Sequence, residues 1–259
     1  MTEPTLRLDR IGHTAVLTID NPPANTFERH NLSTLATIVR ELEQEPDIYA
    51  LIISGAGDKF FSAGADLRQF ANGDKATAQS LAQLFGEAFE TLSRFRGLTI
   101  AAINGYAMGG GLECALACDL RIAEEQAIMS LPEASVGLLP CAGGTQNLPW
   151  LVGEGWAKRM VLCGERIDAS TALAIGLIEQ KVPQGGALDA AIALAAQAAR
   201  QSPQALAACK KLIQAGRHVP IGANLAQERE AFVRLFDGED QREGVAAFLE
   251  KRPPQWKNA

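Results

Sequence analysis

Two glutamates stand in apolar segments of this 259-residue chain. Glu113 is the only charged residue between Leu98 and Ala117. A carboxyl group in such surroundings is typical of an acid or base whose pKa is tuned by burial, although a first-turn glutamate favoured by a helix dipole is the structural alternative. Glu133 follows a proline, where first-turn acids are common, so taken alone the structural interpretation is the stronger one for it. Together the two are candidates for acid–base chemistry.

Three consecutive glycines, Gly109 to Gly111, precede the helix that carries Glu113. They expose backbone N–H groups at a positive helix N-terminus, which suits a developing oxyanion or a phosphate and favours an ionised Glu113. The stretch is neither a GxGxxG fingerprint nor a Walker loop, because no lysine follows the glycines.

A third stretch of small residues runs from Phe61 to Leu67, in the order Phe-Ser-Ala-Gly-Ala-Asp-Leu. Small side chains allow the backbone to come close to a ligand. The alternative is a glycine-bearing turn in which Asp66 serves as a helix N-cap, and taken alone this alternative is favoured.

The elements that must position these residues alternate between strands and helices. Strand–strand–helix units recur roughly every fifty residues without sequence repetition, which favours an α/β fold. A hairpin with its turn at Asp9–Gly12 opens the chain. Apolar runs predict further strands, and helical spacing predicts helices. The strands are expected at Leu6–Leu8, Ala15–Ile19, Ala50–Gly55, Thr99–Gly105, Leu120–Ala123 and Ile128–Leu131, and the helices at Leu32–Glu45, Ala78–Leu92 and Leu112–Ala117.

The last part of the chain is predicted to be helical. Helical periodicity rich in Ala and Leu runs from Ala187 to Glu250, and Ser202-Pro203 is a helix start signal. We expect a core over residues 1–200, a helical C-terminal region over residues 201–259, and a frayed tail at Lys251–Pro254.

Composition excludes several classes of protein. A net charge of -6 and an apolar content of 47% predict a soluble globular protein without a bulk nucleic-acid footprint. No apolar run is long enough to span a bilayer, and the N-terminus does not resemble a signal peptide. An odd number of scattered cysteines fits a reducing cytoplasm, and we expect them to act as buried small hydrophobic residues rather than as metal ligands. They are Cys114, Cys118, Cys141, Cys163 and Cys209.

The three stretches, in this order, resemble the crotonase family, also called the enoyl-CoA hydratase/isomerase family. The combination is SAGADL, then NGYAMGGGLE, then Pro132-Glu133 followed by Cys141–Gln146. The resemblance extends from the opening hairpin through Gly164–Ala169 to the helical tail. It implies a spiral of repeated ββα units with a helical C-terminal region, and homotrimers that pair into hexamers.

The resemblance also assigns roles to the two glycine-bearing loops. In the family, two backbone N–H groups form an oxyanion hole for a thioester carbonyl, and they match Ala65 and Gly110. The nucleotide end of coenzyme A is expected along Ala63, Gly64, Asp66 and Leu67. Coenzyme A enters as part of the substrate, so no metal or separate cofactor is implied.

The family's hydratases hold the attacking water between two glutamates, which match Glu113 and Glu133. We expect Glu113 to act as the base and Glu133 as the proton donor. Retention of both favours syn hydration of a 2-enoyl-CoA to a 3-hydroxyacyl-CoA. The alternatives are an enoyl-CoA isomerase, a hydrolase, a decarboxylase or a non-catalytic binding protein with this fold. A few members bind RNA, but the acidic balance of this chain argues against that.

Two positions depart from the family pattern. Asn147 stands where an arginine often follows the GAGGTQ-like segment, which puts any role of that arginine in doubt. The loop Asn21–Thr26 is also a variant, and in the family this loop helps to shape the acyl pocket.

Overall fold

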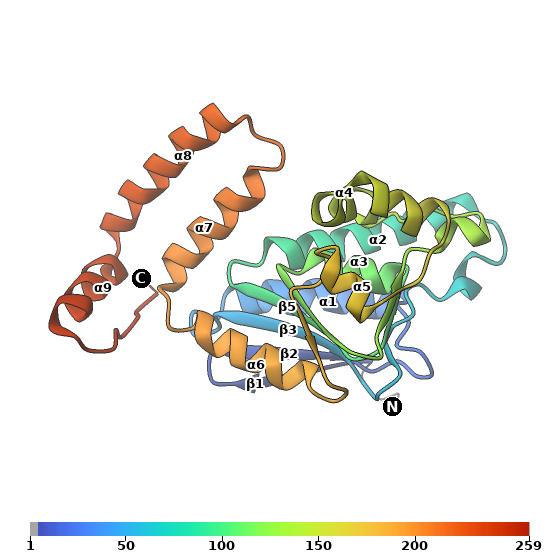
Figure 1. Cartoon of the computed structure of the whole chain (residues 1–259), viewed down its shortest axis with the longest axis horizontal. Coiled ribbons are helices and arrows are strands. Elements are labelled where there is room, and N and C mark those ends of the chain that lie inside the picture. The colour runs from blue at the N-terminus through green and yellow to red at the C-terminus, as the bar shows by residue number, and fades with distance from the viewer. Residues whose placement is uncertain (1–4, 259) are drawn as a thin grey trace.

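The computed structural model describes residues 5–258 and contains two β-sheets covered by helices (Figure 1). The six-stranded sheet has the order β1-β2-β3-β5-β7-β10 and the four-stranded sheet the order β4-β6-β8-β9. The pairs β1–β2 and β8–β9 are antiparallel, and the other pairs are parallel. The strands are β1 (Leu6–Ile11), β2 (Thr14–Ile19), β3 (Ala50–Gly55), β4 (Phe60–Ser62), β5 (Leu98–Ile103), β6 (Tyr106–Met108), β7 (Leu120–Glu124), β8 (Ile128–Ser130), β9 (Ile167–Asp168) and β10 (Gln180–Val182).

Helices follow the strand pairs and then dominate the C-terminal part. Within residues 5–258, no helix combines the length and the apolar character that crossing a membrane requires. The α-helices are α1 (Arg29–Glu43), α2 (Lys75–Arg94), α3 (Gly110–Ala117), α4 (Gly144–Leu162), α5 (Ala169–Ala174), α6 (Ala187–Ala198), α7 (Pro203–Ala215), α8 (Ile221–Arg234) and α9 (Glu239–Glu250), and the 3-10 helices are η1 (Leu67–Phe70), η2 (Glu133–Val136) and η3 (Leu235–Asp237).

The expected ββα repeat is confirmed. In each of the pairs β3–β4, β5–β6 and β7–β8, the first strand joins the large sheet and the second joins the small one, before helix α2, α3 or α4 follows. The expected interval of fifty residues is wrong for the second repeat. The units begin at Ala50, Leu98 and Leu120, and the second interval is short because α3 has only eight residues.

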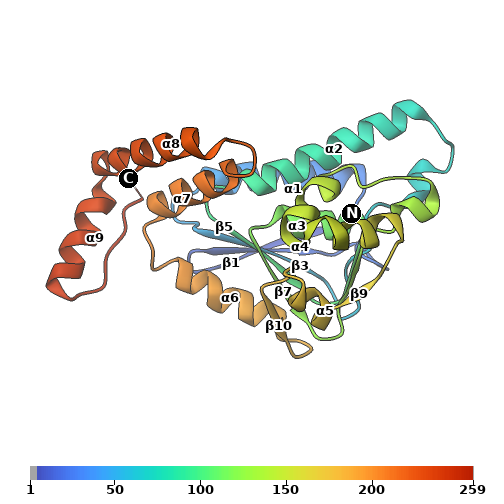
Figure 2. The ribbon, with the colours of Figure 1, turned by 45° about the horizontal axis from the view of Figure 1, so that its top comes forward.

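Both faces of the large sheet are buried, which explains the unbroken apolar runs in its central strands. Leu51 and Ile53 point to the side covered by α1, α2 and α3, while Ile52 between them points to the other side. That second side is covered by α6, whose alanines Ala187 and Ala191 pack against the strands (Figure 2). The sheet is therefore a rigid central layer from which the loops of the small sheet project.

The opening hairpin is present, but its turn lies later than expected. Strand β1 continues through Ile11, so the reversal falls at Gly12-His13 rather than at Asp9–Gly12. Gly12 has a φ of +57°, a conformation that favours glycine, and this fixes the turn at that residue.

Helices α7 to α9 form an arm that extends from the body of the molecule (Figures 1 and 2). Ser202 caps α7 as expected, since its hydroxyl accepts a hydrogen bond from the Ala205 N–H at 3.3 Å. No residue of α8 is buried, and α7 buries only Pro203. The arm thus presents most of its surface to its surroundings.

The expected frayed tail at Lys251–Pro254 is wrong. Both amino groups of the Arg252 guanidinium donate to the carboxylate of Glu243, at 2.6 and 2.9 Å, and this pairing lowers the pKa of Glu243 to about 2. The Lys257 N–H donates to Asp240 at 2.7 Å. These contacts hold the tail against α9.

The cysteines divide into two groups, all with free thiols. Cys114 and Cys118 are buried next to α3, as expected for small hydrophobic residues. Cys141, Cys163 and Cys209 are exposed, so the expectation of burial is wrong for these three.

The side chain of Asn104, at the point where the chain leaves β5, ties this point to the end of β3 and the loop that follows it. It donates to the carbonyls of Gly55 and Gly57, at 2.9 and 2.7 Å, and accepts from the Gly55 N–H at 3.2 Å. Because Asn104 and Gly55 are buried, the groups of Gly55 have no solvent to replace this side chain.

Asn104→Ala should therefore lower the free energy of unfolding by about 2–4 kcal/mol, since it leaves the buried backbone groups of Gly55 without this partner. Asn72→Ala, in an exposed loop, is the matched control and should change stability by about 0.5 kcal/mol or less. Urea unfolding followed by circular dichroism compares the two variants. Equal stabilities would contradict a structural role for the Asn104 side chain.

Candidate active site

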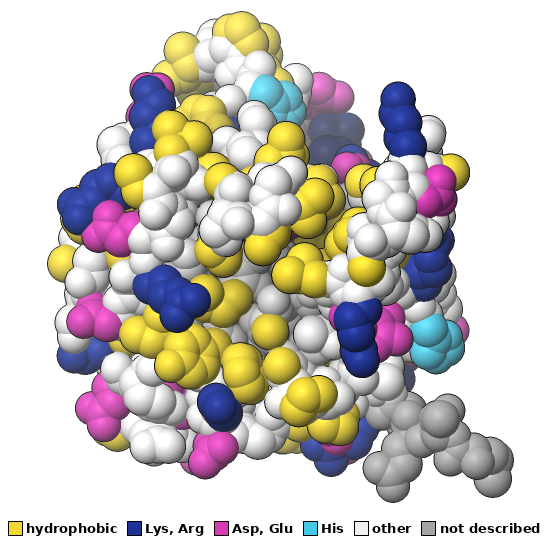
Figure 3. All heavy atoms as spheres, turned by 90° about the vertical axis from the view of Figure 1, so that its right-hand side faces the viewer, with side chains coloured by type: hydrophobic (Ala, Val, Ile, Leu, Met, Phe, Trp, Pro, Cys, Tyr) yellow, Lys and Arg dark blue, Asp and Glu magenta, His cyan; other side chains and the backbone are white. Residues whose placement is uncertain are grey.

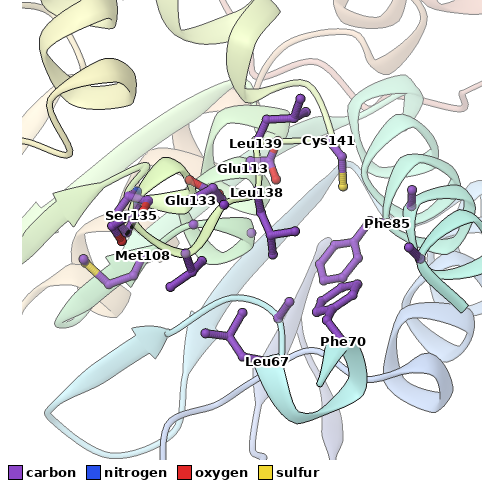
Figure 4. A pocket seen from close by; sticks show the side chains of 18 of the residues that line it. Leu67, Phe70, Phe85, Met108, Glu113, Glu133, Ser135, Leu138, Leu139 and Cys141 are labelled. Atoms are coloured by element: carbon purple, nitrogen blue, oxygen red, sulfur yellow. Dashed lines mark hydrogen bonds between the residues drawn. The ribbon is translucent and has the colours of Figure 1, made fainter. Parts of the chain in front are cut away.

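A cavity of about 500 Å³ brings the three stretches together (Figure 4). Its wall includes Ala65, Gly110, Glu113 and Glu133. The cavity lies among η1, α2, α3 and the segment that follows η2. On the face seen from the right-hand side of Figure 1, hydrophobic side chains gather at the surface (Figure 3).

The parallel pairing of β4 with β6 places the two glycine-bearing loops at one edge of the small sheet. Phe60 pairs with Tyr106 and Ser62 with Ala107, so both chains leave the sheet in the same direction. Gly64 has a φ of +84°, and a Cβ there would lie 2.7 Å from the Met108 carbonyl oxygen. Only glycine permits this approach of one loop to the other.

The amides of Ala65 and Gly110 lie close together at this contact. A Cβ on Gly110 would be 3.6 Å from the Ala65 nitrogen. Gly110 is the first residue of α3, and among residues 5–258 neither amide donates a hydrogen bond to another protein group. Both residues line the cavity. Two neighbouring free N–H groups, one of them at the N-terminus of a helix, can stabilise negative charge on one ligand oxygen.

Of the other residues expected along the first loop, some line the cavity and some do not. Ala63 and Leu67 line the cavity, whereas Gly64 and Asp66 do not. Asp66 is the N-cap of η1 and accepts the Arg68 N–H at 3.0 Å, and its carboxylate also pairs with the Arg68 guanidinium at 2.6 Å. Asp66 therefore has the N-cap role that the loop sequence alone favoured.

Glu113 is 2% exposed and is held by backbone amides. Its Oε1 accepts the N–H groups of Ala142 at 2.8 Å and Gly144 at 2.9 Å. Burial raises the pKa of Glu113, and these hydrogen bonds oppose the rise. The helix N-terminus that binds the carboxylate is that of α4, which begins at Gly144, and not the glycine run at Gly109 that the sequence indicated. Because two amides occupy Oε1, Oε2 remains available to a ligand.

Glu133 lacks such support. Both of its carboxylate oxygens are buried without a hydrogen-bond partner among the described residues. Burial is the largest cause that raises its pKa to about 7, and the charge of Glu113 adds to the rise. The side chain lies over Gly109, where a Cβ would be 3.1 Å from Oε1. Glu133 can thus carry a proton near neutral pH.

The two carboxyl groups consequently differ in the way that paired acid–base chemistry requires. Two backbone amides stabilise the anion of Glu113, whereas Glu133 accepts no hydrogen bond from another described residue, has only its own amide nearby to lower its pKa, and faces the charge of Glu113. Such a pair favours one ionised and one protonated carboxyl group at the same time.

The two departures from the family pattern have structural counterparts. The Asn147 side-chain oxygen accepts a hydrogen bond from the guanidinium of Arg217, at 3.2 Å, so the turn after α7 supplies an arginine next to this position. The loop Asn21–Thr26 does not line the cavity, contrary to the role that the resemblance implied. Instead, Asn25 donates to the Phe60 carbonyl at 2.8 Å and supports β4.

Several lining residues were not identified from the sequence. Helix α2 contributes Ala78, Ala82 and Phe85, whose spacing of four and three residues marks one helix face. Leu138 and Leu139 come from an irregular segment that carries no pattern, and Cys141 begins the GAGGTQ-like segment, to which the resemblance gave no role in lining the cavity. The amides of Ala142 and Gly144 were missed as well, because a backbone donor has no residue signature.

Because the buried Glu133 carboxylate has no hydrogen-bond partner among the described residues, we expect it to destabilise the folded state at pH values where it is ionised. The pKa of Glu133 in the folded state, about 7, exceeds the ordinary value of 4.5. Between these two pH values the folded state therefore binds more protons than the unfolded state. The folded state loses stability as the pH rises through about 7. Glu133→Gln should therefore exceed the wild type in stability at pH 8 by about 1–2 kcal/mol, after allowance for screening at this half-buried site, and by less at pH 5.

Denaturant unfolding at the two pH values measures this difference. Glu125→Gln removes an exposed carboxylate and is the matched control, with no pH-dependent gain expected. A gain for Glu133→Gln that is the same at pH 5 and pH 8 would rule out the raised pKa.

Comparisons with known proteins agree with this geometry. The profile of the enoyl-CoA hydratase/isomerase family matches residues 11–259. A probable enoyl-CoA hydratase of Bacillus subtilis (strain 168) is 40% identical over 245 residues, which cover 94% of this chain and 95% of the relative. The 2,3-dehydroadipyl-CoA hydratase of Escherichia coli (strain K12) is 40% identical over 255 residues, which cover 97% and 98%.

The solved structure of Pseudomonas aeruginosa DspI is similar to this chain over most of its length, with 63% identity and a TM-score of 0.96. The match covers 98% of this chain and 97% of that one. The family profile, the related sequences and the two-sheet fold with C-terminal helices all point the same way. The chain belongs to the crotonase, or enoyl-CoA hydratase/isomerase, family of acyl-CoA enzymes.

Proposed function

We propose that the protein catalyses the syn addition of water across the 2,3 double bond of a 2-enoyl-CoA. One observation carries this proposal. Glu113 and Glu133 lie in the same cavity as two free amides, and among the described residues backbone N–H groups donate to the Glu113 carboxylate but not to that of Glu133. Addition at one carbon and protonation at its neighbour require two groups, and a single carboxylate serves both poorly.

The thioester carbonyl oxygen accepts hydrogen bonds from the Ala65 and Gly110 amides. As water attacks C3, the electrons of the double bond move onto this oxygen to form an enolate. Fixed N–H dipoles stabilise that charge without reorganising, which is the largest contribution in many acyl-transfer sites. The nucleotide end of coenzyme A lies along the turn from Ala63 to Leu67.

Glu113 accepts one proton from the attacking water through Oε2, while its Oε1 stays bound to the backbone. Glu133 gives its proton to C2 as the enolate collapses to the thioester. The reaction leaves Glu113 protonated and Glu133 ionised, and proton exchange with solvent restores the starting state. The different pKa values of the two groups match these opposite tasks.

Isomerisation of the double bond is the second candidate in this family. It needs one group to remove a proton and return it to another carbon of the same substrate. A second buried carboxyl group with a proton near neutral pH favours hydration, because that proton has a use only when water adds. A purely binding protein with this fold would have no use for two such groups.

The protein acts as a homo-oligomer, a trimer or a pair of trimers, with the arm of α7 to α9 at the subunit contacts. Large hydrophobic side chains on the arm are exposed in the single chain, which a stable monomer rarely tolerates. Those exposed by 60% or more are Ile213, Ile221, Phe232, Val233, Phe248 and Leu249.

Size-exclusion chromatography with light scattering should thus give a mass three or six times that of the chain. Phe248→Ser, at an 82% exposed position, should shift the mass toward smaller species. A wild-type protein that remains a monomer at micromolar concentration would overturn the assembly proposal.

Replacement of either glutamate tests the chemistry. Glu113→Gln and Glu133→Gln should each lower kcat for crotonyl-CoA hydration by about 10²–10⁴-fold, with little change in KM, because each variant loses a group that acts in the transition state. The double variant should be far less impaired than the product of the two effects, since the groups act as a unit.

Loss of the conjugated thioester absorbance measures these rates, and Glu125→Gln serves as the control. If Glu133→Gln keeps the full rate while Glu113→Gln is inactive, the two-glutamate mechanism fails. If neither variant changes the rate, hydration by this site is excluded.

The two pKa shifts also predict a bell-shaped pH dependence of kcat/KM. The acid form of Glu133 is lost as the pH rises through about 7, and the base form of Glu113 is lost as the pH falls through its raised pKa. The two limbs of this pH profile report apparent pKa values of the coupled pair of glutamates, not of either residue alone. A rate that stays constant from pH 6 to pH 9 would contradict an essential protonated Glu133.

A further inference from the structure

One end of the cavity is lined only by hydrocarbon side chains and one thiol. Figure 4 shows Phe70, Phe85 and Cys141 at this end, separated from Met108 and Ser135 at the other. We call this end the apolar branch; Phe70, Phe85 and Cys141 line it, together with Ala78 and Ala82 from the same face of α2 as Phe85. An all-apolar surface in a binding cavity fits an apolar part of a ligand.

The apolar branch starts at the amides that bind the thioester oxygen. The Phe85 ring touches Gly110, since its Cε1 atom would be 2.9 Å from a Cβ there. From Phe85 the lining face of α2 reaches Ala82 and then Ala78, on one side of the helix. Ala82 lies three residues from Phe85, a rise of about 4.5 Å along the helix, and Ala78 lies one turn beyond it. The wall between Phe85 and Ala82 has room for a few methylene groups beyond the reacting double bond.

The apolar branch adjoins a second, polar hollow at Ala82 and Cys141. This hollow has a volume of about 630 Å³ and shares only these two residues with the first cavity. Its other lining is polar and includes Arg40, Glu87 and Glu90. Ala82 and Cys141 therefore lie where apolar surroundings give way to polar ones. Cys141 is exposed on one side, but desolvation on the other and the charges of Glu113 and Glu133 raise the pKa of its thiol to about 11, so the thiol is uncharged at neutral pH.

We propose that the apolar branch binds a saturated acyl tail longer than that of crotonyl-CoA, and that Ala82 and Cys141 determine the tail length at which binding stops improving. This inference rests on the proposed function, because it takes the ligand to be an enoyl-CoA. It makes Ala82 and Cys141 specificity-determining residues that do not touch the reacting atoms.

The physical consequence is a defined dependence on chain length. Each methylene group buried in an apolar site improves binding about fourfold. The value of kcat/KM should rise by about this factor per methylene while the tail fills the branch. It should then level off, because a longer tail must pass Ala82 and Cys141 into polar surroundings.

The test measures kcat/KM for straight-chain 2-enoyl-CoA thioesters of four, six, eight, ten and twelve carbons. In Ala82→Trp, the ratio of the ten-carbon to the four-carbon value should fall about tenfold or more, because the indole fills the end of the branch. Ala82→Val should shift the ratio in the same direction by less, and it guards against misfolding of the larger variant. Cys141→Ala should move the levelling-off to a longer chain.

Ala76→Trp is the matched control, since Ala76 is an exposed residue of the same helix and lines neither cavity. It should keep the wild-type ratio. A flat or falling wild-type profile, or a wild-type ratio in both Ala82 variants, would overturn the inference. These outcomes differ from failure of the proposed function, in which the wild type hydrates no member of the series.

Discussion

The burial of two carboxyl groups in one apolar cavity is the constraint on which the rest of this structure depends. A buried carboxylate must find hydrogen-bond donors or keep its proton. Glu113 finds donors in the Ala142 and Gly144 amides, at the N-terminus of α4. Glu133 finds none among the described residues and has its pKa raised to about 7. The difference between the two glutamates is thus a property of the backbone around them.

The same constraint explains why the loops around the cavity are so rich in small residues. Gly144 must bring its N–H to the Glu113 carboxylate, and a Cβ there would lie 3.0 Å from Oε1. Gly111 packs on the Ser62 carbonyl oxygen, where a Cβ would be at 2.1 Å. These contacts hold the loops after β4 and β6 together. They keep the Ala65 and Gly110 amides at fixed positions relative to the glutamates, as preorganised stabilisation of charge requires.

The sequence was informative wherever the side-chain pattern reflects burial. The run Ala50–Gly55 is buried throughout, and strand β3 has those same bounds. Glu113 stood out because its neighbours are apolar, and it is indeed buried. The capping role of Asp66, favoured from the loop sequence alone, is also present.

Other features could not be predicted because they depend on groups, such as backbone amides, that every kind of residue can supply. Backbone amides hold Glu113, and any residue could supply them. The tail after Glu250 contains two prolines and so resembles a disordered end, yet the Arg252–Glu243 pair holds it in place.

In the proposed mechanism both glutamates act on one face of the substrate, Glu113 on water and Glu133 on C2. Hydration of crotonyl-CoA in deuterium oxide, with the product's relative configuration at C2 and C3 read by nuclear magnetic resonance, examines this geometry. The mechanism predicts a single diastereomer in which the deuterium at C2 and the hydroxyl group at C3 have been added to the same face. A mixture of diastereomers, or addition to opposite faces, would contradict it.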